Sequence, residues 1–371
     1  MNVGLCLSDP HPEIASDGSK TRTLSASRFA GRYRIVDFML SNMVNSGIYT
    51  IGMLLNSHYQ SLIGHIGMGK EWDLARKTGG VYFFPPYLAD VRQTVNNELD
   101  GPLRRAAEFM AGTNSEYMVL ADSSVVCNMD YRAVIEAHKK SGADVTAVFS
   151  KKQITATEVE SAAVFDINDN GRIISVNRPP QTNDSLNVSL GLYVMQKKYF
   201  IQLIAGEKNC GMQRFSRVLL AGALDRLAVK AYEFRGYSAQ ICSLDSFFHY
   251  NMDMLDIEKS NSLFNSEGRR IYTSRRDSLP TKYGKSAAIN NSIIADGCQI
   301  EGTVENCVIC RNVRIGAGAT VKRSILQEGT VVGKNSELEY IITDREVFIS
   351  ENRNMIGYRT YPVYIEQSKY V

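Results

Sequence analysis

The chain of 371 residues lacks the features that mark several large classes of protein. No apolar run approaches the roughly 20 residues that cross a bilayer, and residues 1–9 carry no basic stretch, so we expect neither a membrane span nor a signal peptide. Lys and Arg number 42 against 39 Asp and Glu, and the net charge of +3 supplies no strong field. We therefore expect no nucleic-acid partner and no membrane partner.

Cysteine and histidine are scarce and scattered. Seven cysteines, an odd number, are typical of free thiols in a reducing compartment, which predicts a cytoplasmic protein. Cys307 and Cys310 form a C-x-x-C pattern, but no second pair has zinc-site spacing, so a structural role is favoured. The five histidines show no metal-binding spacing either. No metal site is predicted. P-loop, GxGxxG and GxSxG motifs are also absent from suitable contexts.

What is present over the first 255 residues is an alternation of short apolar runs with helical patterns. Helical spacing recurs from Ile35 to Val44, and residues 168–171 read Asn-Asp-Asn-Gly, a hairpin turn. This order predicts an α/β fold with a parallel sheet covered on both faces. Ligands of such sheets bind at the carboxyl ends of strands, so the loops after Leu7 and Ala121 are candidate sites. The expected strands are residues 3–7, 51–55, 117–121 and 145–149.

After residue 286 the sequence follows a period of about six residues. Most three-residue apolar steps end in a large aliphatic residue, and the register returns about every 17 residues, from Val313 to Thr330 to Val347. The earlier steps near residues 294 and 300 fit less regularly. This pattern predicts a left-handed parallel β-helix of hexapeptide repeats, with a plain antiparallel β-domain as the alternative. The interior residues are expected to be Ile309, Ile315, Val321, Leu326, Val332 and Leu338.

Two domains follow from these patterns. Residues 1–256 are expected to form the α/β domain and residues 286–371 the β-helix. Residues 257–285 are polar, with paired arginines that include Arg275 and Arg276, and are expected to form a solvated linker.

Residues 31–42, GRYRIVDFMLSN, followed by NSGI at 45–48, resemble the GGKYRIIDFxLSNxxNSGI block of the glucose-1-phosphate adenylyltransferase (ADP-glucose pyrophosphorylase) family. The similarity continues at residues 129–131, 189–194 and 251–255 and spans nearly the whole chain. It implies a Rossmann-like nucleotidyltransferase domain followed by a left-handed β-helix. The family joins glucose 1-phosphate to ATP, releasing pyrophosphate and ADP-glucose.

The chain departs from this family where phosphate is held. The Gly-rich loop after the first strand is replaced by SDPHPEI at residues 8–14, whose prolines remove NH donors and whose acids repel a triphosphate. The lysine that follows in the family corresponds to Leu24. In the sugar-phosphate pocket, the family's EKP becomes Asn177-Arg178-Pro179, and the remaining pocket residues are Ser189, Gly191 and Tyr193.

The family's metal carboxylates are also missing. They correspond to Ser124 and Gln240, and a neutral amide does not replace a carboxylate for Mg²⁺. Asp122 or Asp245 would substitute only after a loop shift. The resemblance therefore implies no cofactor for this chain, with Mg²⁺ only in a catalytic partner.

These departures favour a regulatory, catalytically inactive D-type subunit. It would assemble with a catalytic chain of the same family, as a hetero-oligomer and most simply a heterotetramer, with self-association left open. The alternatives are a weakly active adenylyltransferase with rearranged metal ligands and, more distantly, a hexapeptide acyltransferase. The family's anionic effector site implies that Arg22, Arg28 and Arg34 bind a phosphorylated small molecule. The alternative for these arginines is that they are solvated or pair with acids such as Asp37.

Overall fold

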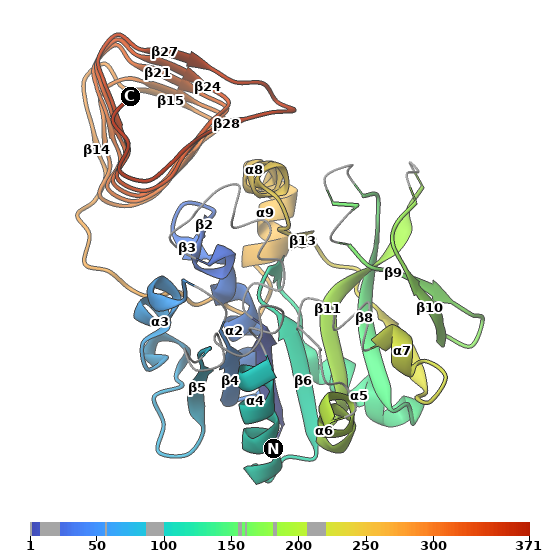
Figure 1. The fold of residues 1–371 in the computed structure, drawn as a ribbon. Coiled ribbons are helices and arrows are strands. Elements are labelled where there is room, and N and C mark those ends of the chain that lie inside the picture. The colour runs from blue at the N-terminus through green and yellow to red at the C-terminus, as the bar shows by residue number, and fades with distance from the viewer. Residues whose placement is uncertain are drawn as a thin grey trace.

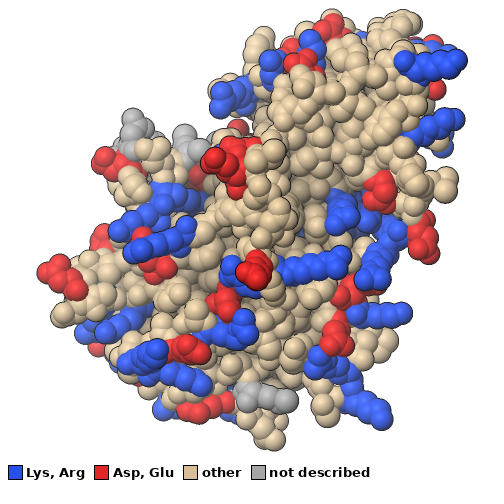
Figure 2. Space-filling model, turned by 180° about the vertical axis from the view of Figure 1, so that it is seen from behind, with Lys and Arg blue, Asp and Glu red and all other residues tan. Residues whose placement is uncertain are grey.

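The computed structural model describes residues 2–7, 23–55, 58–86, 100–154, 158–159, 162–180, 184–205 and 220–371. They form an α/β domain and, above it, a triangular prism of stacked strands (Figure 1). Within these ranges, no helix is both long and apolar enough to cross a bilayer. Basic and acidic side chains are interspersed over the face in Figure 2, in keeping with the small net charge.

A mixed sheet, nine-stranded in the described part of the chain, forms the centre of the α/β domain. Strands β1, β4, β5 and β6 run parallel, as expected, and β12 runs parallel to β8. Strand β11 differs from these strands in direction and lies antiparallel between β6 and β8. The strands are β1 Val3–Leu7, β4 Thr50–Leu54, β5 Gly80–Phe84, β6 Tyr117–Asp122, β8 Val145–Lys152, β9 Val164–Ile167, β10 Ile173–Asn177, β11 Leu186–Gln196 and β12 Val229–Glu233.

The reason for the antiparallel strand lies in its connection. A parallel return needs a crossover, usually a helix. Between β8 and β11 the structure instead describes the hairpin of β9 and β10, whose turn is the predicted Asn-Asp-Asn-Gly at residues 168–171.

Helices cover both faces of the sheet. Along β1, Cys6 packs into one apolar core with residues of α2 and α5, while Val3, Leu5 and Leu7 pack into a second core with α4 and α6. This alternation is the period of two that a strand imposes. The helices are α2 Ile35–Asn45, α3 Gln60–Ile66, α4 Asp100–Gly112, α5 Tyr131–Ser141, α6 Lys197–Ala205, α7 Ala221–Ala223, α8 Leu244–Asp253 and α9 Ile257–Phe264, with 3₁₀ turns η1 Leu24–Ala26 and η2 Lys70–Trp72. Two small sheets join β2 Arg28–Phe29 to β3 Tyr33–Arg34 and β7 Val125–Cys127 to β13 Ser238–Gln240.

The C-terminal domain is the predicted left-handed β-helix. Its three parallel sheets mostly pair residues 17 positions apart, such as Thr303 with Thr320. An earlier coil is shorter and pairs Ala288 with Thr303, and the last is longer and pairs Ile341 with Val363. All six predicted interior residues lie in its apolar core. The strands are β14 Lys282–Tyr283, β15 Ala288–Asn290, β16 Ile293–Ile294, β17 Gln299–Ile300, β18 Thr303–Glu305, β19 Val308–Ile309, β20 Arg314–Ile315, β21 Thr320–Lys322, β22 Ile325–Leu326, β23 Val331–Val332, β24 Glu337–Glu339, β25 Ile341–Thr343, β26 Phe348–Ile349, β27 Asn354–Ile356 and β28 Val363–Ile365.

The segment at 257–285, expected as a linker, contains α9 and β14 joined by an extended stretch. The domain boundaries themselves stay a prediction. An apolar core joins the two domains: Phe29, Phe38 and Phe248 of the first pack with Val308 and Ile325 of the second. In β19 and β22, the residues that follow these two, Ile309 and Leu326, point into the β-helix instead. One sheet of the prism thus serves both cores.

Candidate functional site

Ser124 and Gln240, which the resemblance predicts at the positions of the family's metal carboxylates, lie on adjacent backbone segments. Strand β13 pairs Gln240 with Val125, and the backbone NH of Ile241 donates to the carbonyl oxygen of Ser124 at 3.0 Å. Both side chains are buried. The Ser124 hydroxyl has no hydrogen-bond partner among the residues that the structure describes. At the two positions where the resemblance predicts metal ligands, the chain therefore has a buried hydroxyl and a buried amide.

These groups do not fit a magnesium ion. Mg²⁺ binds hard oxygen ligands in octahedral geometry, usually through one or two carboxylates. The carboxylate nearest in sequence is Asp122, whose Oδ1 accepts a hydrogen bond from the backbone NH of Ser124 at 2.7 Å. Asp245 lies in the first turn of α8. In the described ranges, three His, Cys, Asp or Glu side chains do not gather anywhere as a metal site would require.

The predicted pocket residues of β11 lie against this place. The Ser189 hydroxyl is 3.2 Å from the Tyr193 hydroxyl and accepts from the backbone NH of Gly191 at 3.2 Å. Gly191 has φ +62°, and a Cβ there would lie 2.7 Å from Cβ of Asp122. Only glycine fits so close an approach. The structure thus brings Ser189, Gly191 and Tyr193 together with Asp122.

Asn177 and Arg178 lie at the end of the edge strand β10 and are exposed. The Asn177 side chain donates to Asp166 Oδ2 at 2.6 Å and to the Ser175 hydroxyl at 2.7 Å, both within its own hairpin. Val164 of β9 pairs with both Asn177 and Val188, so Asn177 is two strands away from β11. These two positions are consequently at the rim of the sheet rather than beside Ser124.

Leu24, which the resemblance predicts at the position of the family's lysine, begins η1 and packs against the core between the domains. The next residue, Ser25, links this turn to the ends of β1 and β6. Its hydroxyl is 2.5 Å from that of Ser123, which donates to the carbonyl oxygen of Leu7 at 2.7 Å. The residue predicted to replace the family's lysine is therefore an apolar side chain packed against an apolar core. The loop at residues 8–14 and Arg22 lie outside the described residues.

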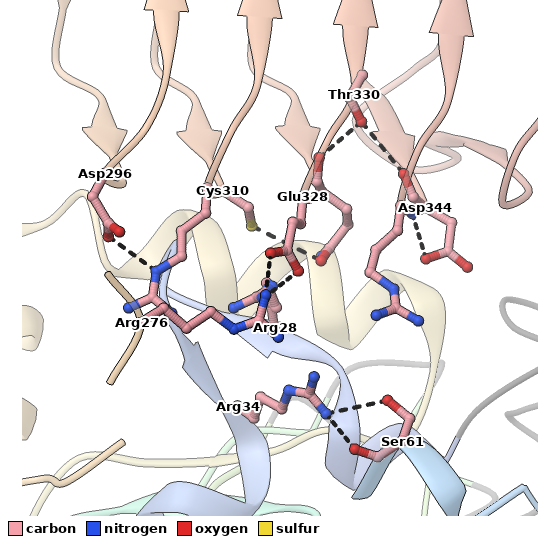
Figure 3. A network of polar contacts seen from close by, with 12 residues as sticks. Arg28, Arg34, Ser61, Arg276, Asp296, Cys310, Glu328, Thr330 and Asp344 are labelled. Atoms are coloured by element: carbon pink, nitrogen blue, oxygen red, sulfur yellow. Dashed lines mark hydrogen bonds and ion pairs between the residues drawn. The ribbon is translucent and has the colours of Figure 1, made fainter. Parts of the chain in front are cut away.

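Arg28 and Arg34, predicted as effector ligands, are buried and not solvated (Figure 3). The Arg28 guanidinium forms an ion pair with Glu328 of the β-helix, whose Oε1 also accepts from Arg276 at 2.6 Å. Arg34 donates through Nη1 to the carbonyl oxygen of Ser61 at 2.8 Å. Asp37, the anticipated acidic partner, instead accepts from the backbone NH of Arg34 at 2.8 Å.

The arginines perturb one another. Burial, and next the nearby Arg28, lower the pKa of Arg34 to about 9; Arg345 and Arg276 act in the same direction. Burial alone would raise the pKa of Glu328, but Arg28, Arg276 and Arg345 outweigh it and hold that pKa below its usual value. The site therefore carries excess positive charge.

Glu328, Arg276 and Arg345 belong to this site although no sequence motif pointed to them. Arg276 belongs to a run expected to be solvated; its side chain is indeed exposed, and it also pairs with Glu328, which the sequence did not indicate. Its neighbour Arg275 contacts Glu71 of the α/β domain at 3.4 Å. Nothing local in the sequence links Glu328 to Arg28, 300 residues away.

Comparison with known proteins agrees with this architecture. Residues 19–257 match the nucleotidyl transferase family, and residues 279–361 match the GlmU-like C-terminal hexapeptide family. The chain is 32% identical to the glycogen biosynthesis protein GlgD of Bacillus subtilis over 95% of this chain and 91% of the relative. It is 34% identical to the glucose-1-phosphate adenylyltransferase of Thermosipho africanus over 80% of this chain and 72% of the relative. The chain belongs to the bacterial glucose-1-phosphate adenylyltransferase (ADP-glucose pyrophosphorylase) family and is similar to its D-type member.

Proposed function

We propose that this chain is a regulatory, catalytically inactive subunit of a glucose-1-phosphate adenylyltransferase that acts in glycogen biosynthesis. The observation that carries the proposal is that Ser124 and Gln240, at the positions expected for the family's metal carboxylates, lie on adjacent backbone segments where Gln240 pairs with Val125 and the NH of Ile241 donates to Ser124. The fold keeps the two positions together while their side chains are a hydroxyl and an amide. The reaction and the process are those after which the T. africanus and B. subtilis relatives are named.

The chemistry of nucleotidyl transfer explains why a hydroxyl and an amide at these two positions argue against catalysis. Transfer of a nucleotidyl group develops negative charge on the α-phosphate, and enzymes stabilise it with metal ions and aimed donors. Ser124 and Gln240 are neutral, and Leu24 is apolar where the family has a lysine. A site that lacks both the metal carboxylates and the cation is expected to bind a nucleotide triphosphate weakly and to turn it over slowly.

The proposed partner is a catalytic chain of the same family, which would hold the Mg²⁺. The family fold and the core that joins the domains are intact here, which is what an assembly subunit needs. The assembly we propose is a heterotetramer whose activity responds to a phosphorylated small molecule. Arg28 and Arg34 remain our candidates for contacting that effector, with Arg22.

A weakly active adenylyltransferase is the second candidate, and one observation favours it. Asp122 lies at the carboxyl end of β6 against Gly191, and its Oδ1 contacts the backbone of Ser124. A movement of this loop would present one carboxylate near the lost metal position.

The test measures ADP-glucose formation by the purified chain with Mg²⁺, alone and after co-expression with a catalytic chain of the family. We expect the chain alone to be at least about 100-fold less active than the catalytic chain, and the co-purified assembly to differ from the catalytic chain in its response to substrate or effector. Comparable turnover by the chain alone would overturn the inactivity. Failure to co-purify, or an assembly with unchanged kinetics, would overturn the regulatory role.

Two variants separate the two candidates. Ser124→Asp with Gln240→Asp restores both carboxylates but not the phosphate loop or the lysine, so it should stay inactive. Asp122→Asn should abolish any residual activity if Asp122 is a substitute ligand. Unchanged residual activity in Asp122→Asn would exclude the weakly active enzyme with that ligand.

A further inference from the structure

Four arginine side chains lie near one another where the two domains meet, and three of them, Arg28, Arg276 and Arg345, act on one carboxylate. We call Arg28, Arg34, Arg276 and Arg345 the arginine cluster. The first two come from β2 and β3, the third from the stretch before β14, and the fourth from the turn between β25 and β26. The carboxylate is Glu328, in the turn between β22 and β23, and Figure 3 shows it between Arg28 and Arg276.

The position of Glu328 follows from the stacking of the β-helix coils. One corner of the prism carries Asp296, Arg311, Glu328 and Arg345 in successive coils, and backbone hydrogen bonds join these turns. Arg311 pairs with Asp296 through Nε at 3.0 Å. Glu328 is 12% exposed and turns to the α/β domain, where Arg28 pairs with it. The stacking of the coils therefore fixes the position along the β-helix at which Glu328 faces the α/β domain.

Two carboxylates, Glu328 and the Asp37 that acts on Arg34, leave the arginine cluster incompletely satisfied. Arg28 and Arg34 are 3% and 4% exposed. The Nε atoms of Arg28, Arg34 and Arg345 have no hydrogen-bond partner in the described part of the chain. Glu328 offers two oxygens and a single charge, and both oxygens are already engaged. A phosphate group brings nearly two charges and three acceptor oxygens, which suits several guanidinium groups better.

We propose that Glu328 is a tethered anion that occupies the phosphate-binding position of the arginine cluster and thereby competes with a phosphate monoester for it. When Glu328 occupies this position, its ion pairs with Arg28 and Arg276 join the β-helix to the α/β domain and to the stretch between the domains. An external phosphate can bind only when Glu328 moves away, so phosphate binding replaces the ion pairs of Glu328 with contacts to the ligand. The proposal deepens the regulatory function, but its test uses this chain alone, so that its failure would leave the assembly and inactivity untouched.

The test compares binding of inorganic phosphate by the wild type and by Glu328→Gln. The amide keeps the size of the side chain and removes the charge that repels phosphate. Isothermal titration and thermal unfolding, at constant ionic strength set with chloride, give the affinity and the shift in Tm. We expect Glu328→Gln to bind phosphate roughly tenfold more tightly than the wild type and to gain more Tm from it.

Controls separate the cluster from a general charge effect. Glu337→Gln removes an exposed acid from β24 of the same domain and should bind phosphate as the wild type does. Glu328→Gln with Arg34→Gln should lose the gain. Glu328→Ala, purified in phosphate and then dialysed, is the second neutral variant if Glu328→Gln does not fold. A gain of less than about threefold in the neutral variant, or a gain that persists without Arg34, would overturn the proposal.

Discussion

Asp37 has no exposed surface, and it contacts both Arg34 and the imidazole of His65. Its Oδ2 accepts from the backbone NH of Arg34 at the start of α2, and its Oδ1 is 2.6 Å from Nε2 of His65 on α3. The short contact with Asp37 favours a charged imidazole. Burial opposes it and is the larger effect, so the pKa of His65 lies below its ordinary value of 6.5. The pair links α2 to α3 beside the arginine cluster.

This shift predicts a pH dependence of stability. The unfolded chain protonates His65 near pH 6.5, while the folded chain does so only at lower pH. As pH falls from about 7.5 to about 5.5, the unfolded state binds more protons and the free energy of unfolding decreases. His65→Gln should remove part of this decrease, measured by urea unfolding at several pH values. His138, whose pKa burial also lowers, should account for another part.

His249→Gln is the matched control, because His249 is exposed. It should leave the pH dependence as in the wild type. A slope that is identical in the wild type and in His65→Gln would show that His65 does not titrate in this range.

At the scale of elements, the β-helix was predictable because its rule is local. Each short strand needs one inward aliphatic residue, and each corner repeats after a nearly constant number of residues, so the interior can be read from spacing alone. The antiparallel course of β11 was not predictable in this way. Its apolar run suits either direction, and only the hairpin of β9 and β10 before it determines the direction in which it enters the sheet.

The register of the β-helix can be tested within one strand. Val332 of β23 is 1% exposed and points into the core, while Val331 beside it is half-buried and points outward. Val332→Asp would bury a charge with no partner, which destabilises by about 3 kcal/mol or more. Val331→Asp, the control, should change the free energy of unfolding by about 1 kcal/mol or less. Urea unfolding of both variants measures this difference, and a Val332→Asp variant as stable as the control would contradict the register.

At the scale of the whole molecule, the contacts that join the domains were the least predictable. The GRYRIVDFMLSN block resembles a family signature, but only the structure shows that the block packs against the β-helix. Its Phe38 lies in the core that packs on the β-helix, and its Gly31 approaches Ile293. Arg28 meets Glu328 across 300 residues, and no spacing rule connects them. The fold of each domain could therefore be predicted, whereas the arginine cluster could not.

Gly31 tests whether the two domains unfold as one unit. It has φ +79°, and a Cβ there would lie 3.3 Å from Cγ2 of Ile293 and 3.4 Å from the carbonyl oxygen of Ile309, both in the β-helix. Gly31→Val would add the strain of a left-handed backbone, about 1–2 kcal/mol, and would also force the domains apart. Gly47→Val is the matched control: its φ is +76°, and among the described residues no atom other than those of its chain neighbours lies within 4 Å of its Cβ position. By differential scanning calorimetry, we expect one lowered transition for Gly47→Val and two separated transitions for Gly31→Val, because the latter disrupts the core shared by Phe29, Val308 and Ile325. If both variants shifted Tm equally in a single transition, backbone strain alone would explain them and the shared core would not couple the domains.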